Sequence, residues 1–277
     1  MNKLTLTALL ILPATTIFAQ SGTFSIKGTV PNAGSQAKAF LLYSSDGNNI
    51  TDSTAVVNGG FEFKGTVATP TMGSLLIGHS GQTFGELRRS RKVDVLSMYI
   101  EPGNTQVTGV DSVKKAKIIG SKLNDENQRL IAELKPFNDK LTALYAEERA
   151  VPKDKQTDEL SAAFDKRENA IDADKKVVYT KFIKANPASY VSLNSLQGAV
   201  GYYPEASDLE PLLNVLSPEL KATKQGKAYA EMIPKLRMVA LGAQAPEFAQ
   251  NDKDGKSIAL SSFRGKYVLI DFWAGRD

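Results

Sequence analysis

The hydrophobic pattern of this chain changes its period near Ser121, and that change limits what the chain can fold into. Before it, apolar and polar positions alternate, as in FSIKGTV, where Phe24, Ile26, Gly28 and Val30 fall on one face of a strand. After it, apolar residues recur at steps of three and four, which is the spacing of one face of an α-helix. The sequence therefore predicts an α+β protein, with a β region followed by a helical region.

Residues 20–120 are predicted to form an antiparallel β sandwich or a barrel-like sheet. Short strand patterns follow one another closely, and turn residues separate them. The stretch Asn58-Gly59-Gly60 is a hairpin signal because Asn and Gly tolerate a positive φ. Pro102-Gly103 is typical of a further turn.

Residues 121–240 are predicted to be α-helical. A first apolar stripe contains Pro136, which we expect to kink or divide the helix. A second stripe ends near Asn186, just before a proline. Apolar stripes of this kind are usually core-facing sides of helices and not cofactor sites. Three shorter helices are expected after them, at 188–199, 205–216 and 218–236.

The charge of the chain gives little indication of its partner. The 277 residues carry a formal net charge of +4, and the basic residues are spread along the sequence, so we expect no nucleic-acid partner. The densest basic cluster is LRRSRK, residues 87–92. We interpret it as a solvated loop or hairpin edge in preference to a phosphate or lipid patch.

Residues 1–19 are predicted to be a signal peptide. A short positive start precedes an apolar run, and Ala19 is a small residue suited to the last position before cleavage. The run is too short and too rich in threonine to span a bilayer comfortably, and no later stretch is apolar enough to do so. We therefore expect a periplasmic protein with no membrane span after cleavage.

The chain contains no cysteine and one histidine, His79. The missing cysteines exclude disulfides, thiolate metal sites and a cysteine nucleophile within this sequence. His79 has no motif beside it, so we expect a structural role and no catalytic triad. The stretch NDKDGK superficially resembles a calcium loop but lacks the carboxylates of one, and we interpret it as a hairpin turn. No metal and no organic cofactor are expected.

The last 37 residues, 241–277, carry the most specific pattern in the chain. They contain G-x-x-A-P-E-F, then D-x-D-G-K, and then L-S-S-F-R-G-K-Y-V-L-I-D-F-W-A. This pattern resembles the opening of the redoxin and thioredoxin-like family, in particular its exported thiol-disulfide oxidoreductases of the TlpA/ResA type. The positions that match are Gly242, Pro246, Phe248, Asp254, Gly255, Lys256, Leu260, Phe263, Gly265, Lys266, Asp271, Phe272, Trp273 and Ala274.

The resemblance implies the first strands of an incomplete thioredoxin-like α/β domain, with YVLIDFWA as a strand buried on both faces. In that family a Trp-Cys-x-x-Cys sequence follows, and its thiolate, stabilised at a helix N-terminus, is the nucleophile of disulfide exchange. Asp271 matches a buried acid that assists proton transfer, and Trp273 matches an aromatic residue packed beside the active centre. The implied partners are protein or small-molecule disulfides and dithiols. No catalytic residue itself is present, so we expect no thiol redox activity.

The β region also resembles a domain of unknown function that precedes many of these oxidoreductases, through the stretches VVNGGFEFKGTV and YIEPGNTQVTG. The sequence departs from the family pattern after Ala274, and three origins are open: a frameshift or premature stop, which we favour, an incompletely predicted gene, and a natural short protein. An alternative function also stays open. The β and helical regions would then form a binding or dimerisation module for an envelope partner.

Overall fold

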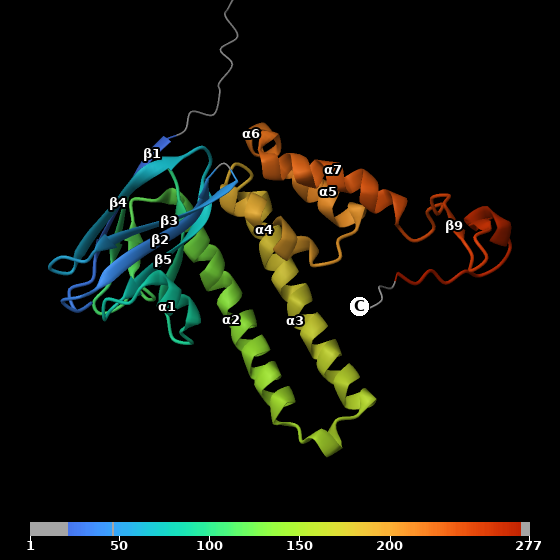
Figure 1. Cartoon of the computed structure of the whole chain (residues 1–277), viewed down its shortest axis with the longest axis horizontal. Helices are drawn as coiled ribbons and strands as arrows, with labels where there is room; N and C mark the ends of the chain where they lie inside the picture. Colours follow the sequence, from blue (N-terminus) through green and yellow to red (C-terminus); the bar gives the residue numbers. More distant parts are fainter. Residues whose placement is uncertain (1–21, 46, 273–277) are drawn as a thin grey trace, which may run out of the picture. The chain divides into compact units, whose positions relative to one another are not determined.

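The structure is a computed structural model, and it describes residues 22–45 and 47–272. The chain divides into two compact units, Met1–Glu133 and Leu134–Asp277, which are described separately (Figure 1). The expected signal peptide lies outside the described residues. The fold is of the mixed α+β class, as the change of period predicts.

The first unit contains two four-stranded sheets, with strand orders β4-β1-β7-β8 and β3-β2-β5-β6. Their inner faces share one core, to which β1 contributes Phe24 and Ile26 and β5 contributes Leu75 and Ile77. The unit is therefore a sandwich, and neither sheet closes into a barrel within the part of the chain that the structure describes. The strands are β1 (Gly22–Thr29), β2 (Lys38–Ser45), β3 (Asn48–Ala55), β4 (Gly60–Val67), β5 (Thr71–Gly78), β6 (Asp94–Ile100), β7 (Gly103–Thr108) and β8 (Lys117–Ile119).

The prediction of a wholly antiparallel domain is wrong for one pair, because β1 and β7 run parallel, from Phe24 opposite Gly103 to Thr29 opposite Thr108. The other strand pairs of the two sheets are antiparallel. Alternation of apolar residues identifies a strand but does not identify its neighbour, so the sequence could not reveal this pairing. The hairpin signal is confirmed at Asn58, whose φ is 51° in the turn between β3 and β4.

A short helix that the sequence analysis missed, α1 (Phe84–Arg89), covers part of the outer face of the second sheet. It starts with a capping box, in which the Thr83 side chain accepts from the Glu86 backbone N–H and Glu86 accepts from the Thr83 backbone N–H. Leu87 is buried against Phe40 and Leu76. The basic stretch 87–92 therefore begins on a helix, where a hairpin edge or loop was expected.

Helix α2 (Lys122–Ala150) begins in the first unit, and its first turn is hydrogen-bonded to the edge strand β6. The Tyr99 backbone N–H donates to Asn124 Oδ1 at 2.8 Å, and Asn124 Nδ2 donates to the Tyr99 carbonyl oxygen at 2.8 Å. Glu101 Oε1 accepts from the Ser121 hydroxyl at 2.5 Å. The Asn124 amide thus takes the place of a neighbouring strand, because it pairs with both backbone groups of one edge residue.

Pro136 does not divide α2, which is continuous to Ala150. Its ring removes one backbone donor from the helix, but both Pro136 and Ala132, whose carbonyl would have accepted that bond, are exposed. Water can hydrate the carbonyl there, so an uninterrupted helix is tolerated.

In the second unit, α2 continues into an antiparallel hairpin with α3 (Asp158–Ala185), joined through the 3₁₀ turn Lys153–Lys155 (Figure 1). Leu141 and Leu144 pack with Phe164 between the two helices. Helix α3 ends at the Asn186 cap, as predicted. The three shorter helical ranges hold four helices, α4 (Tyr190–Val200), α5 (Ala206–Val215), α6 (Pro218–Ala222) and α7 (Lys224–Met238).

These four helices and the end of α3 enclose a second apolar core, formed by Ile183, Leu193, Leu196, Leu209 and Leu213. The two apolar stripes predicted from the sequence lie on α2 and α3 and are core-facing sides, as predicted, since Leu141, Leu144 and Phe164 are buried between these helices. No helix in the described ranges is long and apolar enough to cross a membrane. The unit ends with the small hairpin β9 (Ala249–Asn251) and β10 (Ser257–Ala259), followed by the 3₁₀ turn Leu260–Phe263.

Candidate functional site

One end of the sandwich gathers loops from the whole first unit. The odd-numbered strands β1, β3, β5 and β7 end there, and the even-numbered strands β2, β4, β6 and β8 begin there. This follows because β1 and β7 are parallel and the other paired strands are antiparallel. We call this the loop end. The β1–β2 loop is held to the β3–β4 turn by a bond from the Val30 N–H to the Gly59 carbonyl oxygen, at 2.6 Å. It is held to the β7–β8 loop by a bond from the Asn32 N–H to the Val110 carbonyl oxygen, at 3.1 Å.

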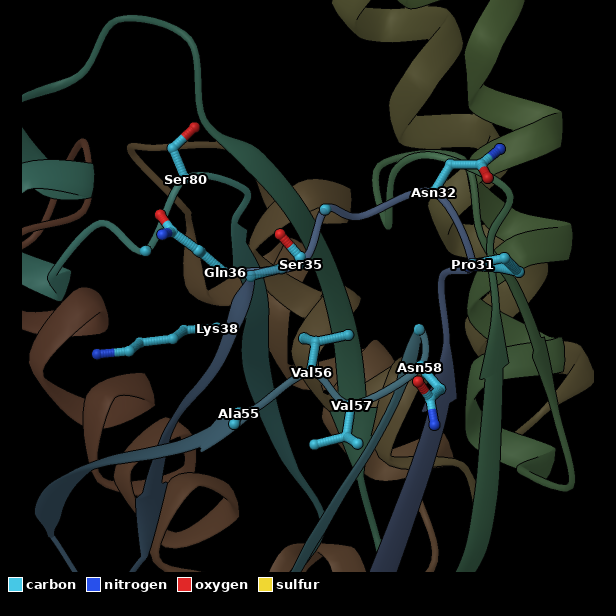
Figure 2. A pocket seen from close by; sticks show the side chains of 14 residues that line it. Pro31, Asn32, Ser35, Gln36, Lys38, Ala55, Val56, Val57, Asn58 and Ser80 are labelled. Carbon is cyan, nitrogen blue, oxygen red and sulfur yellow. The ribbon is translucent and has the colours of Figure 1, made fainter.

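The loop end contains an open hollow of about 890 Å³, which Figure 2 shows from close by. Three segments far apart in the sequence surround it: residues 31–38, residues 55–59, and Ser80 with Gly81. Gly59 has a φ of 76°, and a Cβ there would lie 2.6 Å from the Pro31 Cα. This glycine is required both by its backbone conformation and by the close approach of the neighbouring loop.

The side chains around the hollow are suited to binding and not to acid–base chemistry. Amide and hydroxyl groups predominate among the polar ones, no carboxylate or histidine lines it, and Lys38 is its one charged lining residue. Val57 adds an apolar side chain that is 65% exposed. Such a surface can donate and accept hydrogen bonds with a neutral or anionic ligand. The amide and hydroxyl residues are Asn32, Ser35, Gln36, Asn58 and Ser80.

His79 lies beside the hollow and connects its walls. Its Nδ1 donates to the Ala33 carbonyl oxygen at 2.9 Å, and its Nε2 lies 3.0 Å from Asp94 Oδ2. Both ring nitrogens are therefore engaged in contacts between loops, which supports the structural role expected from the sequence.

Asp94 extends this network to the β7–β8 loop. Its carboxylate accepts from the Ser112 hydroxyl at 2.5 Å, from the Val113 N–H at 3.0 Å and from the Lys114 N–H at 2.9 Å. An ionised carboxylate has the acceptor capacity for all of these bonds. Asp94 thus holds three loops in fixed positions at the loop end.

The family resemblance gives roles to two residues of the C-terminal segment, Asp271 and Trp273. Asp271 is described and exposed, and Trp273 lies outside the described residues. The strand expected from Tyr267 onward is not formed over 267–272, where no strand is assigned and Leu269 is 94% exposed. A strand needs a neighbour to accept its backbone hydrogen bonds, and none of the described strands pairs with this stretch.

The stretch Asp252–Gly255 forms the turn between β9 and β10, as the hairpin interpretation predicts. Asp252 Oδ1 accepts from the backbone N–H groups of Asp254 and Lys256 at 2.9 and 3.0 Å. This is an Asx-type turn, in which the carboxylate is occupied by the chain itself. An open hollow of about 570 Å³ is lined by residues from the two flanking stretches, 244–247 and 260–268.

Comparison with known proteins gives two partial matches. Residues 24–127 match a family described as a domain of unknown function, DUF4369. The thiol-disulfide oxidoreductase ResA of Geobacillus thermodenitrificans is 38% identical over 45 residues, which are 16% of this chain and 26% of ResA. The chain thus spans about a quarter of the length of this curated relative. No solved structure matches. Together the matches suggest a relation to thioredoxin-like thiol-disulfide oxidoreductases.

The sequence analysis missed the hollow at the loop end. Its turn residues were visible, since Asn58-Gly59 marked a hairpin, but their neighbours come from loops more than twenty residues away in either direction. Helix α1 did have a local signal, because Thr83 and Glu86 have the spacing of a capping box.

Proposed function

We propose that this chain is a member of the periplasmic, exported thioredoxin-like oxidoreductases, with its signal peptide cleaved near Ala19, and that disulfide exchange is the activity of the full-length form. The 38% identity to ResA over 45 residues carries the proposal. In it, residues 20–120 are a β domain, 121–240 a helical region and 241–277 the start of a thioredoxin-like domain. In the full-length form, Asp271 assists proton transfer at a cysteine of the family's cysteine pair, and Trp273 packs beside the active centre.

The lack of cysteine limits the reactions that this chain can carry out by itself. Disulfide exchange proceeds by attack of a thiolate, and this 277-residue sequence contains no cysteine. We therefore expect purified residues 20–277 to leave the rate of insulin-disulfide reduction by dithiothreitol unchanged. Turnover above that background would contradict this part of the proposal.

The relation to the oxidoreductases is tested by exchange of the matched segment. The 45 matched residues of ResA are replaced by those of this chain, and the cysteine pair that the family carries is kept. A related segment should keep the surface that the rest of ResA packs against, so we expect a folded chimaera whose disulfide-reductase activity is within about tenfold of that of ResA. A chimaera that folds but has lost its activity would count against the proposal.

A second proposed function is a binding or dimerisation module made of the β domain and the helical region, for an envelope partner. The hollow at the loop end favours it, because neutral hydrogen-bonding groups and one exposed valine line an open surface. Sedimentation and chemical crosslinking of residues 20–240 test it. Self-association, or a crosslinked envelope protein that Val57→Asp abolishes, supports the module, whereas a monomer that crosslinks to nothing counts against it.

A further inference from the structure

Positive charge is concentrated at the loop end. The residues that build it are 30–38, 55–60, 79–94 and 109–117, and they carry eight lysines and arginines against three carboxylates. Their net charge of five exceeds the +4 of the whole chain. The remainder of the sequence is therefore close to neutral, and the charge belongs to this surface. The eight cations are Lys38, Arg88, Arg89, Arg91, Lys92, Lys114, Lys115 and Lys117.

These cations are exposed and are not neutralised in pairs. All eight are classed as exposed, and none of them forms an ion pair within 4.0 Å in the part of the chain that the structure describes. Two of the three carboxylates are occupied by other groups, since Glu86 closes the capping box and Asp94 binds the loops. The surface is thus open to an external anion.

The fold brings the two densest groups of cations together. Lys92 lies two residues before Asp94, so their Cα atoms are at most about 7 Å apart. The Lys114 N–H donates to Asp94 Oδ1 at 2.9 Å. Arg91 and Lys92 are therefore held beside Lys114 and Lys115 by the Asp94 carboxylate, although about twenty residues separate them in the sequence.

Two exposed valines lie at the tips of the same loops. Val57 is 65% exposed in the β3–β4 turn, and Val110 is 70% exposed in the β7–β8 loop. Asn32 donates its backbone N–H to the Val110 carbonyl oxygen and also lines the hollow beside Val57. The valine side chains therefore project from the same end of the sandwich as the cations.

We propose that the loop end is a docking surface for an anionic lipid bilayer. The cations would bind the phosphate groups of the lipid heads, and the two valines would enter the interface between heads and acyl chains. A single-stranded nucleic acid fits less well, because the one Phe, Tyr or Trp of the loop end, Phe84, is half-buried with Arg88 lying over its ring at 5.9 Å. It offers no free face on which a base could stack.

The test measures co-sedimentation of residues 22–277 with vesicles. This form omits the apolar N-terminal stretch, which could itself enter a bilayer. Vesicles of phosphatidylglycerol and phosphatidylcholine should bind the protein, vesicles of phosphatidylcholine alone should not, and binding should weaken as salt is raised from 0.05 to 0.5 M. Soluble glycerophosphoglycerol and inorganic phosphate serve as competitors, and neither should displace the protein at millimolar concentration, since each presents a single phosphate group without a surface.

Two sets of substitutions separate the contribution of the loop-end cations from that of the net charge of the chain. Each cation near an anionic membrane strengthens binding about fivefold, so Arg91, Lys92, Lys114 and Lys115, all replaced by Gln, should together weaken it by about 100-fold or more. The matched control replaces the exposed Lys153, Lys155, Lys181 and Lys184 by Gln, which removes the same charge from the second unit. We expect it to change binding by less than about threefold, because none of these four lysines belongs to the loop end.

Substitution of the two valines tests whether the partner is a bilayer. Val57→Ser with Val110→Ser should weaken vesicle binding about tenfold and leave binding to the soluble polyanion heparin unchanged. Val177→Ser, at a valine of α3 that is 67% exposed, is the control.

The proposal is overturned if neutral vesicles bind equally well, if the quadruple loop-end variant binds like its control, or if heparin binds while anionic vesicles do not. Unchanged circular dichroism and melting temperature establish that each variant is folded.

Discussion

At the scale of single residues, Gly28 shows how a strand position depends on its neighbour across the sheet. Gly28 of β1 lies opposite Phe61 of β4, and a Cβ at Gly28 would lie 1.8 Å from the Phe61 Cζ atom. The aromatic ring therefore fills the space that a side chain at position 28 would take. The alternating pattern placed Gly28 on the correct face, but a pattern along one strand contains no information about which ring covers the glycine.

Gly28→Ala should destabilise the protein by about 1–3 kcal/mol, because the added methyl group forces the Phe61 ring or the strand to move. Urea unfolding followed by circular dichroism measures the change. The control is Gly85→Ala in α1, where the nearest atom to the new Cβ is Arg89 Nη2 at 3.9 Å. This substitution should be neutral or stabilising by up to about 1 kcal/mol, since alanine favours a helix. Equal effects at the two positions would refute the packing argument.

Tyr145 makes the clearest prediction about pH. Its hydroxyl donates to Glu168 Oε1 at 2.5 Å, and this bond to a carboxylate is the main cause that raises the pKa of Tyr145 to about 12 from 10.0. The hydroxyl can donate only while protonated. The contribution of this bond to stability is therefore complete below pH 10 and is lost as the pH rises through about 12.

Glu168→Gln should lower the pKa of Tyr145 toward its ordinary value, because the amide carries no charge to repel the phenolate. An NMR titration of ¹³C-labelled tyrosine rings measures the pKa, and Tyr145→Phe identifies the signal. The control, Glu148→Gln, removes the weakest of the carboxylate effects on Tyr145 and should produce a smaller decrease. A pKa that does not respond to Glu168→Gln would show that the hydrogen bond is not its cause.

At the scale of the elements, the start of α2 belongs to the sandwich. The sequence predicted a change from strands to helices at Ser121, and the structure has α2 starting at Lys122. The period of the apolar residues cannot show that Asn124 pairs with the backbone of Tyr99, because this contact joins residues 25 positions apart. The two compact units divide at residue 133, inside α2, and not where the pattern changes.

Asn124→Leu should destabilise the first unit by about 1–3 kcal/mol, since both backbone groups of the buried Tyr99 lose the partner atoms of the amide. Hydrogen exchange should also become faster at the Tyr99 amide, whose N–H bonds to Asn124 Oδ1. Gln128→Leu makes the same kind of change at an exposed position of α2 and should alter neither measurement. If the Tyr99 amide stays equally protected in Asn124→Leu, the amide is not the group that completes the sheet edge.

Helices, strands and turns were predicted correctly where a local sequence pattern is sufficient. They were predicted wrongly where pairing with a distant segment determines the structure. The hairpin turn at Asn58, the end of α3 at Asn186 and the Asp252–Gly255 turn all follow from short sequence signals, and the structure has each of them. The run from Tyr267 to Phe272 has the composition of a buried strand but lies outside every described sheet. A strand depends on a neighbour, so composition alone cannot establish it.

At the scale of the whole molecule, the sequence indicated the fold class and the order of β and helical regions, but not the surfaces that the fold creates. The hollow and the cations of the loop end come from four separate stretches of the first unit, and each stretch alone resembles an ordinary solvated loop. For Asp271, in contrast, the sequence predicts surroundings that the described residues do not show. The family resemblance predicts buried surroundings for it, and the described residues leave it exposed, so its proton-transfer role stays a prediction.

The exposed apolar run at 267–272 leads to a prediction about self-association. Tyr267, Leu269 and Phe272 are almost fully exposed, and apolar surface of this kind is stabilised when it is covered. Residues 22–277 should therefore associate reversibly as their concentration rises, which sedimentation velocity detects.

Serine at all three of these positions should weaken that association by about tenfold or more, because burying one large apolar side chain contributes about 1.5–3 kcal/mol. The control places serine at Tyr202 and Tyr203, two exposed tyrosines of the α4–α5 loop whose rings pack edge to face with centroids 5.1 Å apart. If exposed aromatic rings in general cause association, the control should act as strongly as the triple variant. If the run 267–272 is responsible, the control should associate like the unsubstituted chain, and a fully monomeric unsubstituted chain would refute the prediction.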